Sequence, residues 1–173
     1  MNKIEDFPME NKTILKVGVL IERRGQLLLI KELNWRNKKY LWNIIKGTFD
    51  SVKDKDLLDT ALREAKEEAN ARVKIKNLSN ILYLKKHGTT LVQFNFVATL
   101  ADLHWNPEKF ARIQNKHDDG HKEDIIEVKF FSPRDLIKIP KKELMGERTY
   151  VSIKSWLQKE SLSKDSLKIL KDY

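Results

Sequence analysis

The first half of the chain alternates apolar stretches with short polar breaks, the pattern of β-strands joined by turns. Apolar, β-branched stretches at 14–22 and 26–31 flank a Gly-bearing break at 23–25, which predicts a β-hairpin. A polar and basic loop is expected at 32–40, and a short strand at 41–45. Further strands are predicted at 73–75, 81–85, 91–100 and 125–131.

The period changes to that of a helix between about Asp56 and Ala69. Asp54 or Asp56 is a candidate N-cap, because a short carboxylate accepts hydrogen bonds from the first backbone amides of a helix. Asn70 follows the last helical residue, where a left-handed C-terminal cap is expected. Apolar residues recur three and four positions apart, as on one face of a helix: Leu57, Leu58, Ala61, Leu62 and Ala65.

The C-terminal part returns to helical signals. Ser132 and Pro133 stand in the order of an N-cap and a first helical residue. After about residue 150, apolar residues at helical spacing predict one or two amphipathic helices. The elements together predict an α/β (α+β) fold in a single domain over 14–173, with a polar N-terminal leader at 1–13.

Composition narrows the function classes. The chain has 173 residues, a formal net charge of +9 and no cysteine. The missing cysteines exclude a disulfide scaffold, a thiolate metal site and a cysteine nucleophile. We expect a soluble, cytoplasmic protein without membrane partners, because no apolar run is long enough to span a bilayer and the N-terminus lacks the apolar core of a signal peptide. The positive charge favours phosphate-bearing partners.

The most informative segment is Arg63-Glu64-Ala65-Lys66-Glu67-Glu68 in the predicted helix. Residues three and four apart share a helix face, so Glu64, Glu67 and Glu68 gather within one turn. Like charges at this spacing repel, and a hard divalent cation would turn that repulsion into ligation. A solvated helix face has the same composition, so these residues alone leave both interpretations open.

The surroundings of this segment resemble the Nudix hydrolase family. The family signature is Gly, five residues, Glu, seven residues, then Arg-Glu-aliphatic-x-Glu-Glu-x-Gly-aliphatic. Gly47 stands as the opening glycine, Trp42 as the Trp often found shortly before it, and the charged core matches at Arg63, Glu64, Glu67 and Glu68. The resemblance covers roughly 14–157 and implies the Nudix fold, a mixed β-sheet sandwiched between α-helices.

Four features depart from that signature. Gly47 and Arg63 are sixteen positions apart instead of fourteen, so the loop between them is about two residues longer. The first Glu falls on Lys53 or Lys55, depending on the end from which it is counted, although Asp54 and Asp56 lie next door. Asn70 replaces the closing glycine, and of all non-glycine residues it adopts the left-handed conformation most readily. The list of departures is completed by the small residues Ala65 and Ala71 at the aliphatic positions.

The resemblance implies a hydrolase that cleaves a pyrophosphate linkage in a nucleoside diphosphate derivative with Mg²⁺ or Mn²⁺. Glu67 and Glu68 would be the principal metal ligands, and Glu64 a further ligand or the base for the attacking water. The backbone carbonyl of Lys46 would complete the coordination. Arg63 is expected among the catalytic residues, as a guanidinium that orients a neighbouring carboxylate.

The general base and the substrate contacts are chosen by position. Glu123 is the first candidate for a general base and Asp124 the second, although a solvated acidic loop explains them equally well. The candidate substrate-binding residues are Arg24, Arg36 and Lys39.

The expected partner is a small phosphorylated nucleotide-type substrate, with nucleic acid possible but not favoured, and family members are often homodimers. The alternative function is a catalytically weakened Nudix-fold module that binds nucleotide or RNA.

Overall fold

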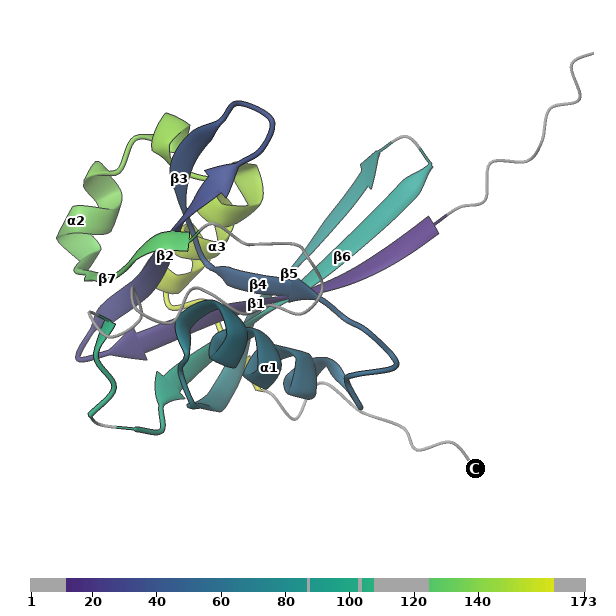
Figure 1. Ribbon diagram of the computed structural model, residues 1–173, viewed down its shortest axis with the longest axis horizontal. Coiled ribbons are helices and arrows are strands. Elements are labelled where there is room, and N and C mark those ends of the chain that lie inside the picture. The colour runs from purple at the N-terminus through teal and green to yellow at the C-terminus, as the bar shows by residue number, and fades with distance from the viewer. Residues whose placement is uncertain (1–11, 87, 103, 108–124, 164–173) are drawn as a thin grey trace, which may run out of the picture.

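The strands form one mixed sheet, shown in Figure 1, in a computed structural model that describes residues 12–86, 88–102, 104–107 and 125–163. The order along the sheet is β3-β2-β1-β6-β5-β8, with β4 beside β1 and β7 beside β2. β1 and β6 run parallel, and every other pair of strands described here is antiparallel. The strands are β1 (Lys12–Arg23), β2 (Gln26–Asn34), β3 (Lys39–Asn43), β4 (Ile45–Thr48), β5 (Val73–Lys86), β6 (Thr89–Leu100), β7 (Ile125–Phe131) and β8 (Leu162–Ser163).

Helices cover both faces of the sheet. The long helix α1 (Leu57–Ala69) packs on one face (Figure 1), and the opposite face carries α2 (Pro133–Lys138), the short 3-10 helix η2 (Lys141–Glu143) and α3 (Glu147–Leu157). Alternation along β1 serves both layers, since Val19 packs in the core under α1 and Leu20 in the core under α3. The predicted α/β architecture is therefore confirmed.

Strand β1 supports two diverging branches of the sheet. β2 pairs with β1 at Glu22↔Leu27 and Arg23↔Gln26, next to the turn, and then pairs with β3 and β7. Farther along the same edge of β1, β4 pairs with residues 16–19. The side chains of Lys46 on β4 and Glu32 on β2 form an ion pair of 2.9 Å between the two branches. The strand that carries Gly47 therefore lies where the branches separate.

Local signals predicted the elements near β1 and α1 well. The N-cap of α1 is Asp56, whose side chain accepts hydrogen bonds from the amides of Leu58 and Asp59, and Asn70 ends the helix with φ 47°. β7 has the predicted bounds, and Ser132 caps α2 before Pro133. The amphipathic helix expected in the tail corresponds to α3.

The predicted loops were too long in two places. The stretch 32–40 was expected to be a loop, but β2 continues to Asn34 and β3 begins at Lys39, because cross-strand pairing extends through these polar residues. The single strand expected at 41–45 is divided at Ile44, whose amide donates to the side chain of Asn43, so that β3 pairs with β2 and β4 with β1. The predicted strands at 73–75 and 81–85 are parts of the continuous strand β5.

Some of the predicted features lie outside the described residues. They include most of the leader, 1–11, and the candidate general bases Glu123 and Asp124. The last two leader residues, Lys12 and Thr13, belong to β1, where they pair with β6. Within the described part of the chain, no helix is long and apolar enough to cross a membrane.

Candidate functional site

Helix α1 packs closely against β4 because its buried face consists largely of small residues. Ala61, Ala65 and Ala69 are fully buried there, so the helix backbone approaches the sheet without a layer of bulky side chains. Glu64 and Glu68 lie on this same face and are buried too. The close packing therefore brings two carboxylates against the strand that carries Gly47.

The three glutamates of α1 have different surroundings. A Cβ built on Gly47 would lie 1.7 Å from Oε1 of Glu64, so this carboxylate occupies the space that only a glycine leaves. Oε2 of Glu68 accepts the backbone N–H of Lys46 at 2.9 Å. The Glu67 side chain is 37% exposed and lies on the outer flank. Two buried carboxylates thus lie beside the Lys46–Gly47 peptide, and the third is accessible.

The guanidinium of Arg63 links this cluster to the loop before the helix. Nη1 donates to Oε1 of Glu64 at 2.6 Å and to Oε2 of Glu67 at 2.9 Å. Nη2 donates to the backbone carbonyl of Thr48 at 3.2 Å. The planar fork therefore fixes two of the three glutamates relative to the end of β4.

Asp54 supplies an acidic group next to the position at which the signature has its first Glu and this chain has a lysine. Its carboxylate binds Arg63 with both oxygens, at 2.8 Å from Nε and 2.9 Å from Nη2, and also accepts the hydroxyl of Thr60 at 2.9 Å. The hydrogen bonds from Arg63 lower the pKa of Asp54 to about 2, and the Asp54 partner raises the pKa of Arg63. The longer loop thus places Asp54, between the two lysines, where it anchors Arg63.

Two basic side chains and one amide side chain lie on the elements near β4. Lys16 on β1 is paired in register with Thr48 on β4 and with Gln93 on β6, and its Nζ donates to Oγ1 of Thr48 at 2.9 Å. Arg148, at the start of α3, donates from Nη1 to Oε1 of Gln93 at 2.9 Å. Burial lowers the pKa of Lys16, with further lowering by the positive charges of Lys46 and Arg148. Burial also lowers the pKa of Arg148.

Comparison with known proteins identifies the family. The family model described as NUDIX domain matches residues 12–152. The chain belongs to the Nudix family. A search of curated proteins returned no significant match.

Solved Nudix structures share the fold at low sequence identity. A NUDIX hydrolase from Nitrosomonas europaea superposes with a TM-score of 0.69 and 20% identity, over 92% of this chain and 98% of that chain. An ADP-ribose pyrophosphatase from Streptococcus suis superposes with a TM-score of 0.58 and 20% identity, over 84% of this chain and 90% of that chain. A MutT NUDIX hydrolase from Burkholderia pseudomallei superposes with a TM-score of 0.57 and 16% identity, over 83% of this chain and 98% of that chain. The Nudix fold implied by the signature is confirmed.

Nudix proteins are typically metal-dependent, and the donor set here suits a hard cation. Carboxylate oxygens of Glu64 and Glu68 lie beside the Lys46–Gly47 peptide, and Glu67 is linked to Glu64 through the guanidinium of Arg63. In the described part of the chain, however, no three acidic or histidine side chains already stand in a metal-holding arrangement. Arg63 lies between Glu64 and Glu67 and hydrogen-bonds to both, which accounts for this arrangement.

The predicted substrate-binding residues do not come together in this Nudix fold. Arg24 lies in the turn between β1 and β2, and Arg36 in the turn between β2 and β3, so the length of β2 separates them. At about 3.3 Å per residue, this strand holds the two turns roughly 25 Å apart. Lys39 begins β3 beside the second turn and is exposed. One small substrate cannot contact both Arg24 and Arg36.

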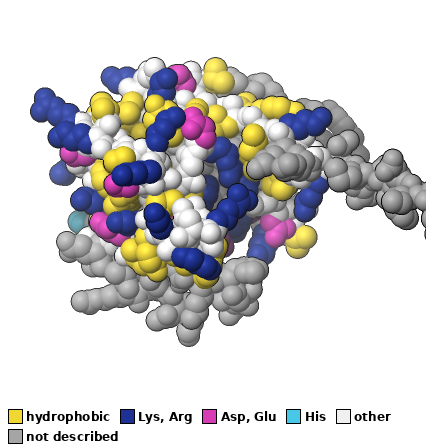
Figure 2. Space-filling view, turned by 90° about the horizontal axis from the view of Figure 1, so that it is seen from above, with side chains coloured by type: hydrophobic (Ala, Val, Ile, Leu, Met, Phe, Trp, Pro, Cys, Tyr) yellow, Lys and Arg dark blue, Asp and Glu magenta, His cyan; other side chains and the backbone are white. Residues whose placement is uncertain are grey.

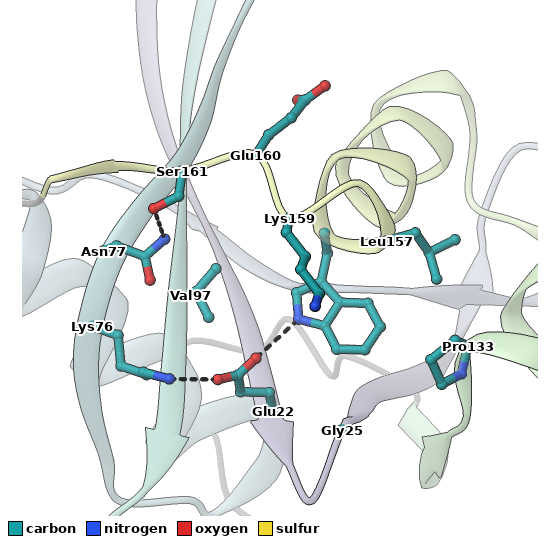
Figure 3. A pocket seen from close by; sticks show the side chains of 11 residues that line it. Glu22, Gly25, Lys76, Asn77, Val97, Pro133, Leu157, Lys159, Glu160 and Ser161 are labelled. Atoms are coloured by element: carbon teal, nitrogen blue, oxygen red, sulfur yellow. Dashed lines mark hydrogen bonds and ion pairs between the residues drawn. The ribbon is translucent and has the colours of Figure 1, made fainter.

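A separate pocket of about 420 Å³ opens on the α3 side (Figure 3). Glu22 lies across its floor, where its carboxylate pairs with Lys76 at 2.7 Å and accepts the indole N–H of Trp156 at 3.3 Å. Val97 and Leu157 supply apolar walls. None of the predicted site residues lines this pocket, so it is distinct from the carboxylate cluster.

Sequence reasoning missed two basic residues, Lys16 and Arg148, that strand register and α3 bring near Thr48 and Gln93. Lys16 carried a signal, since it is a single cation inside an apolar strand stretch. Arg148 carried none, because it reaches the site through Gln93, which is 55 positions away in the chain. Asp54 was recognised only as a possible cap and as a neighbour of the lost glutamate position.

Proposed function

We propose that this Nudix protein is a divalent-metal-dependent hydrolase that cleaves a pyrophosphate linkage in a nucleoside diphosphate derivative. The observation that carries the proposal is the cluster on α1, in which Glu64 and Glu68 lie against the Lys46–Gly47 peptide and Glu67 shares the Arg63 guanidinium with Glu64. An isolated solvated helix face would leave such residues exposed, whereas Glu64 and Glu68 are buried.

The residues fit Mg²⁺ or Mn²⁺ by their chemistry. Glu67 and Glu68 are the proposed principal ligands, and Glu64 is a third ligand or the base for the attacking water. The carbonyl of Lys46 is the proposed backbone ligand, since its own amide already binds Glu68. When bound, the metal would neutralise phosphate charge and lower the pKa of a coordinated water.

Arg63 acts in this proposal as a positioning residue. Its Nε and Nη2 are held by Asp54 and by the carbonyl of Thr48, which leaves Nη1 to orient Glu64 and Glu67. The charged hydrogen bonds fix the carboxylates before substrate arrives, so that less reorganisation accompanies catalysis. The side chain of Lys46 is held away from this edge by its ion pair with Glu32.

The alternative of a weakened binding module was motivated by the lost first Glu and the longer loop. The contacts of Asp54 weaken this argument for a binding module, because Asp54 binds Arg63 through both oxygens from within the longer loop. The hydrolase is therefore the better-supported proposal.

A turnover screen tests the proposal. The substrates are nucleoside triphosphates, ADP-ribose, dinucleoside polyphosphates, nucleotide sugars and capped RNA, each with Mg²⁺, with Mn²⁺ and with excess chelator. We expect release of a nucleoside monophosphate, phosphate or pyrophosphate from at least one substrate, and its loss with chelator. Absence of turnover across the panel with both metals would refute the hydrolase.

The variant Glu67→Gln tests the site assignment. It removes the negative charge of one proposed metal ligand at an accessible position. The fold should therefore be retained, while turnover should fall at least about tenfold. Glu143→Gln is the matched control, since Glu143 lies exposed in η2, and its activity should equal that of the parent. Full activity of Glu67→Gln would show that this carboxylate is no ligand.

A further inference from the structure

Two half-buried cations near the carboxylate cluster lack an ion-pair partner among the described residues. Lys16 donates to the hydroxyl of Thr48, and Arg148 donates to the side-chain amide of Gln93. Both acceptors are neutral. By contrast, the half-buried Lys46 pairs directly with Glu32 at 2.9 Å. The two side chains therefore concentrate positive charge that no direct ion pair among the described residues neutralises.

Their position relates them to the candidate site. Lys16 lies directly across from Thr48 on β4, one residue from Gly47, and the Thr48 carbonyl accepts Arg63. On its other side Lys16 lies across from Gln93, the residue that accepts Arg148. Lys16 on β1 and Arg148 on α3 are thus close enough for the charge of Arg148 to act on Lys16. Figure 2 shows Lys and Arg side chains gathered around a recess in one face of the molecule.

A buried amide network fixes Arg148 in this place. Nε2 of Gln93 donates to Oδ1 of Asn95 at 2.8 Å, which leaves Oε1 of Gln93 to face the guanidinium. Asn95 in turn donates to Ser152 on α3 at 3.0 Å, and Ser152 donates to the carbonyl of Arg148 at 2.7 Å. Gly18 leaves the space that Asn95 fills, since a Cβ there would overlap its side chain. Arg148 is therefore held both at its guanidinium, by Gln93, and at its backbone carbonyl, by Ser152, before any ligand binds.

Holding such charges out of water has a free-energy cost. Partial burial disfavours the charged forms of both side chains, and the charge of Arg148 further disfavours that of Lys16. Glu64 and Glu68 attract Lys16 at longer range, but the proposed function assigns those carboxylates to metal binding. A bound anion would compensate both cations at once, and a preorganised pair of this kind is typical of a binding site.

We infer that Lys16 and Arg148 form an anion subsite that binds a terminal phosphate group of the substrate. A terminal phosphate monoester carries about −1.5 to −2 charges at pH 7, which matches two cations, whereas a bridging phosphate carries about one. The substrates would therefore carry a phosphate chain that ends in a free phosphate, in preference to a diphosphate closed at both ends. The inference rests on the proposed function for the rest of the substrate.

Binding of tripolyphosphate, measured by titration calorimetry in excess EDTA, tests the subsite without turnover. We expect the parent to bind this probe, and Lys16→Met and Arg148→Gln each to weaken it about tenfold, as loss of a charge-assisted hydrogen bond does. Arg148→Lys keeps the charge and should bind more tightly than Arg148→Gln. Arg134→Gln is the control, because Arg134 is exposed on α2, and it should leave affinity unchanged.

A measurement on the unmodified chain covers the case in which a variant fails to fold. Amide NMR shifts on adding tripolyphosphate should be largest around Thr48 and Gln93. Shifts centred elsewhere, no binding in EDTA, or an equal loss in Arg134→Gln would overturn the subsite. Failure of turnover together with these expected results would refute only the hydrolase, while turnover without them would refute only the subsite.

Discussion

Replacing Asp54 with asparagine removes the charge that anchors Arg63 to the loop before α1. The carboxylate is 1% exposed and accepts both Nε and Nη2 of Arg63, together with the hydroxyl of Thr60. Asparagine keeps the size of the side chain but presents an amide N–H₂ where an oxygen now faces donors. The substitution therefore isolates the charged interaction from a change in packing.

The magnitude follows from the pKa of Asp54. The pKa falls from 3.8 to about 2 in the folded protein, mainly through the hydrogen bonds from Arg63. At about 1.4 kcal/mol per unit, this shift corresponds to roughly 2 kcal/mol of folding free energy near neutral pH. Arg63 keeps Glu64 and Glu67 as partners in the variant, so we expect a loss of about 2 kcal/mol.

Urea unfolding at pH 7 measures this loss directly, and thermal unfolding should show a melting temperature lower by about 4–8 °C. The difference also depends on pH in a defined direction. Because folding lowers the pKa of Asp54, its contribution is complete above about pH 5 and is lost as the pH falls from about 4 towards 2. The stabilities of the parent and Asp54→Asn should therefore converge in that window.

The matched control is Asp50→Asn in the same loop. Asp50 has a side chain that is 40% exposed, and the ammonium of Lys53 lies 4.0 Å from its carboxylate, so its removal should change stability by less than about 0.5 kcal/mol. If Asp54→Asn were as stable as the parent at pH 7, or if its deficit did not shrink on acidification, Asp54 would not anchor Arg63 as argued.

Two further substitutions test backbone positions around the site. Gly47→Ala should displace the Glu64 carboxylate, because the new Cβ would overlap it. We expect stability to fall by about 1–3 kcal/mol and metal-dependent turnover to fall as well. Thermal unfolding and the turnover screen measure the two effects. Asn70→Ala should cost about 1 kcal/mol in urea unfolding, because Asn70 ends α1 with φ 47°, a conformation that alanine adopts at a cost.

Each of these has an internal control. Gly25→Ala places a methyl group in open space, although at a positive φ, so it should lower stability without lowering turnover. Turnover unchanged in Gly47→Ala would contradict the contact with Glu64. Asn70→Gly relieves the backbone cost while removing the same side chain, including its contact with Lys66. Equal losses for Asn70→Ala and Asn70→Gly would assign the effect to that contact instead of the cap.

The sequence by itself determined the features that depend on near neighbours. Helix α1, its caps at Asp56 and Asn70, and the placement of three carboxylates within one turn follow from spacing of three and four residues. The strand of 125–131 and the start of α2 at Ser132 are local in the same way. These signals, with the glycine at 47, were sufficient to indicate the Nudix family.

The tertiary structure decided which distant residues meet those carboxylates. Asp54, and not a residue at the signature position, reaches Arg63 because the longer loop folds back on α1. Strand register places Lys16 beside Thr48 and Gln93, and the packing of α3 places Arg148 beside Gln93. Strand register and the position of α3 both depend on the whole core. Periodicity describes the face on which a side chain lies, but only packing between elements determines its partner.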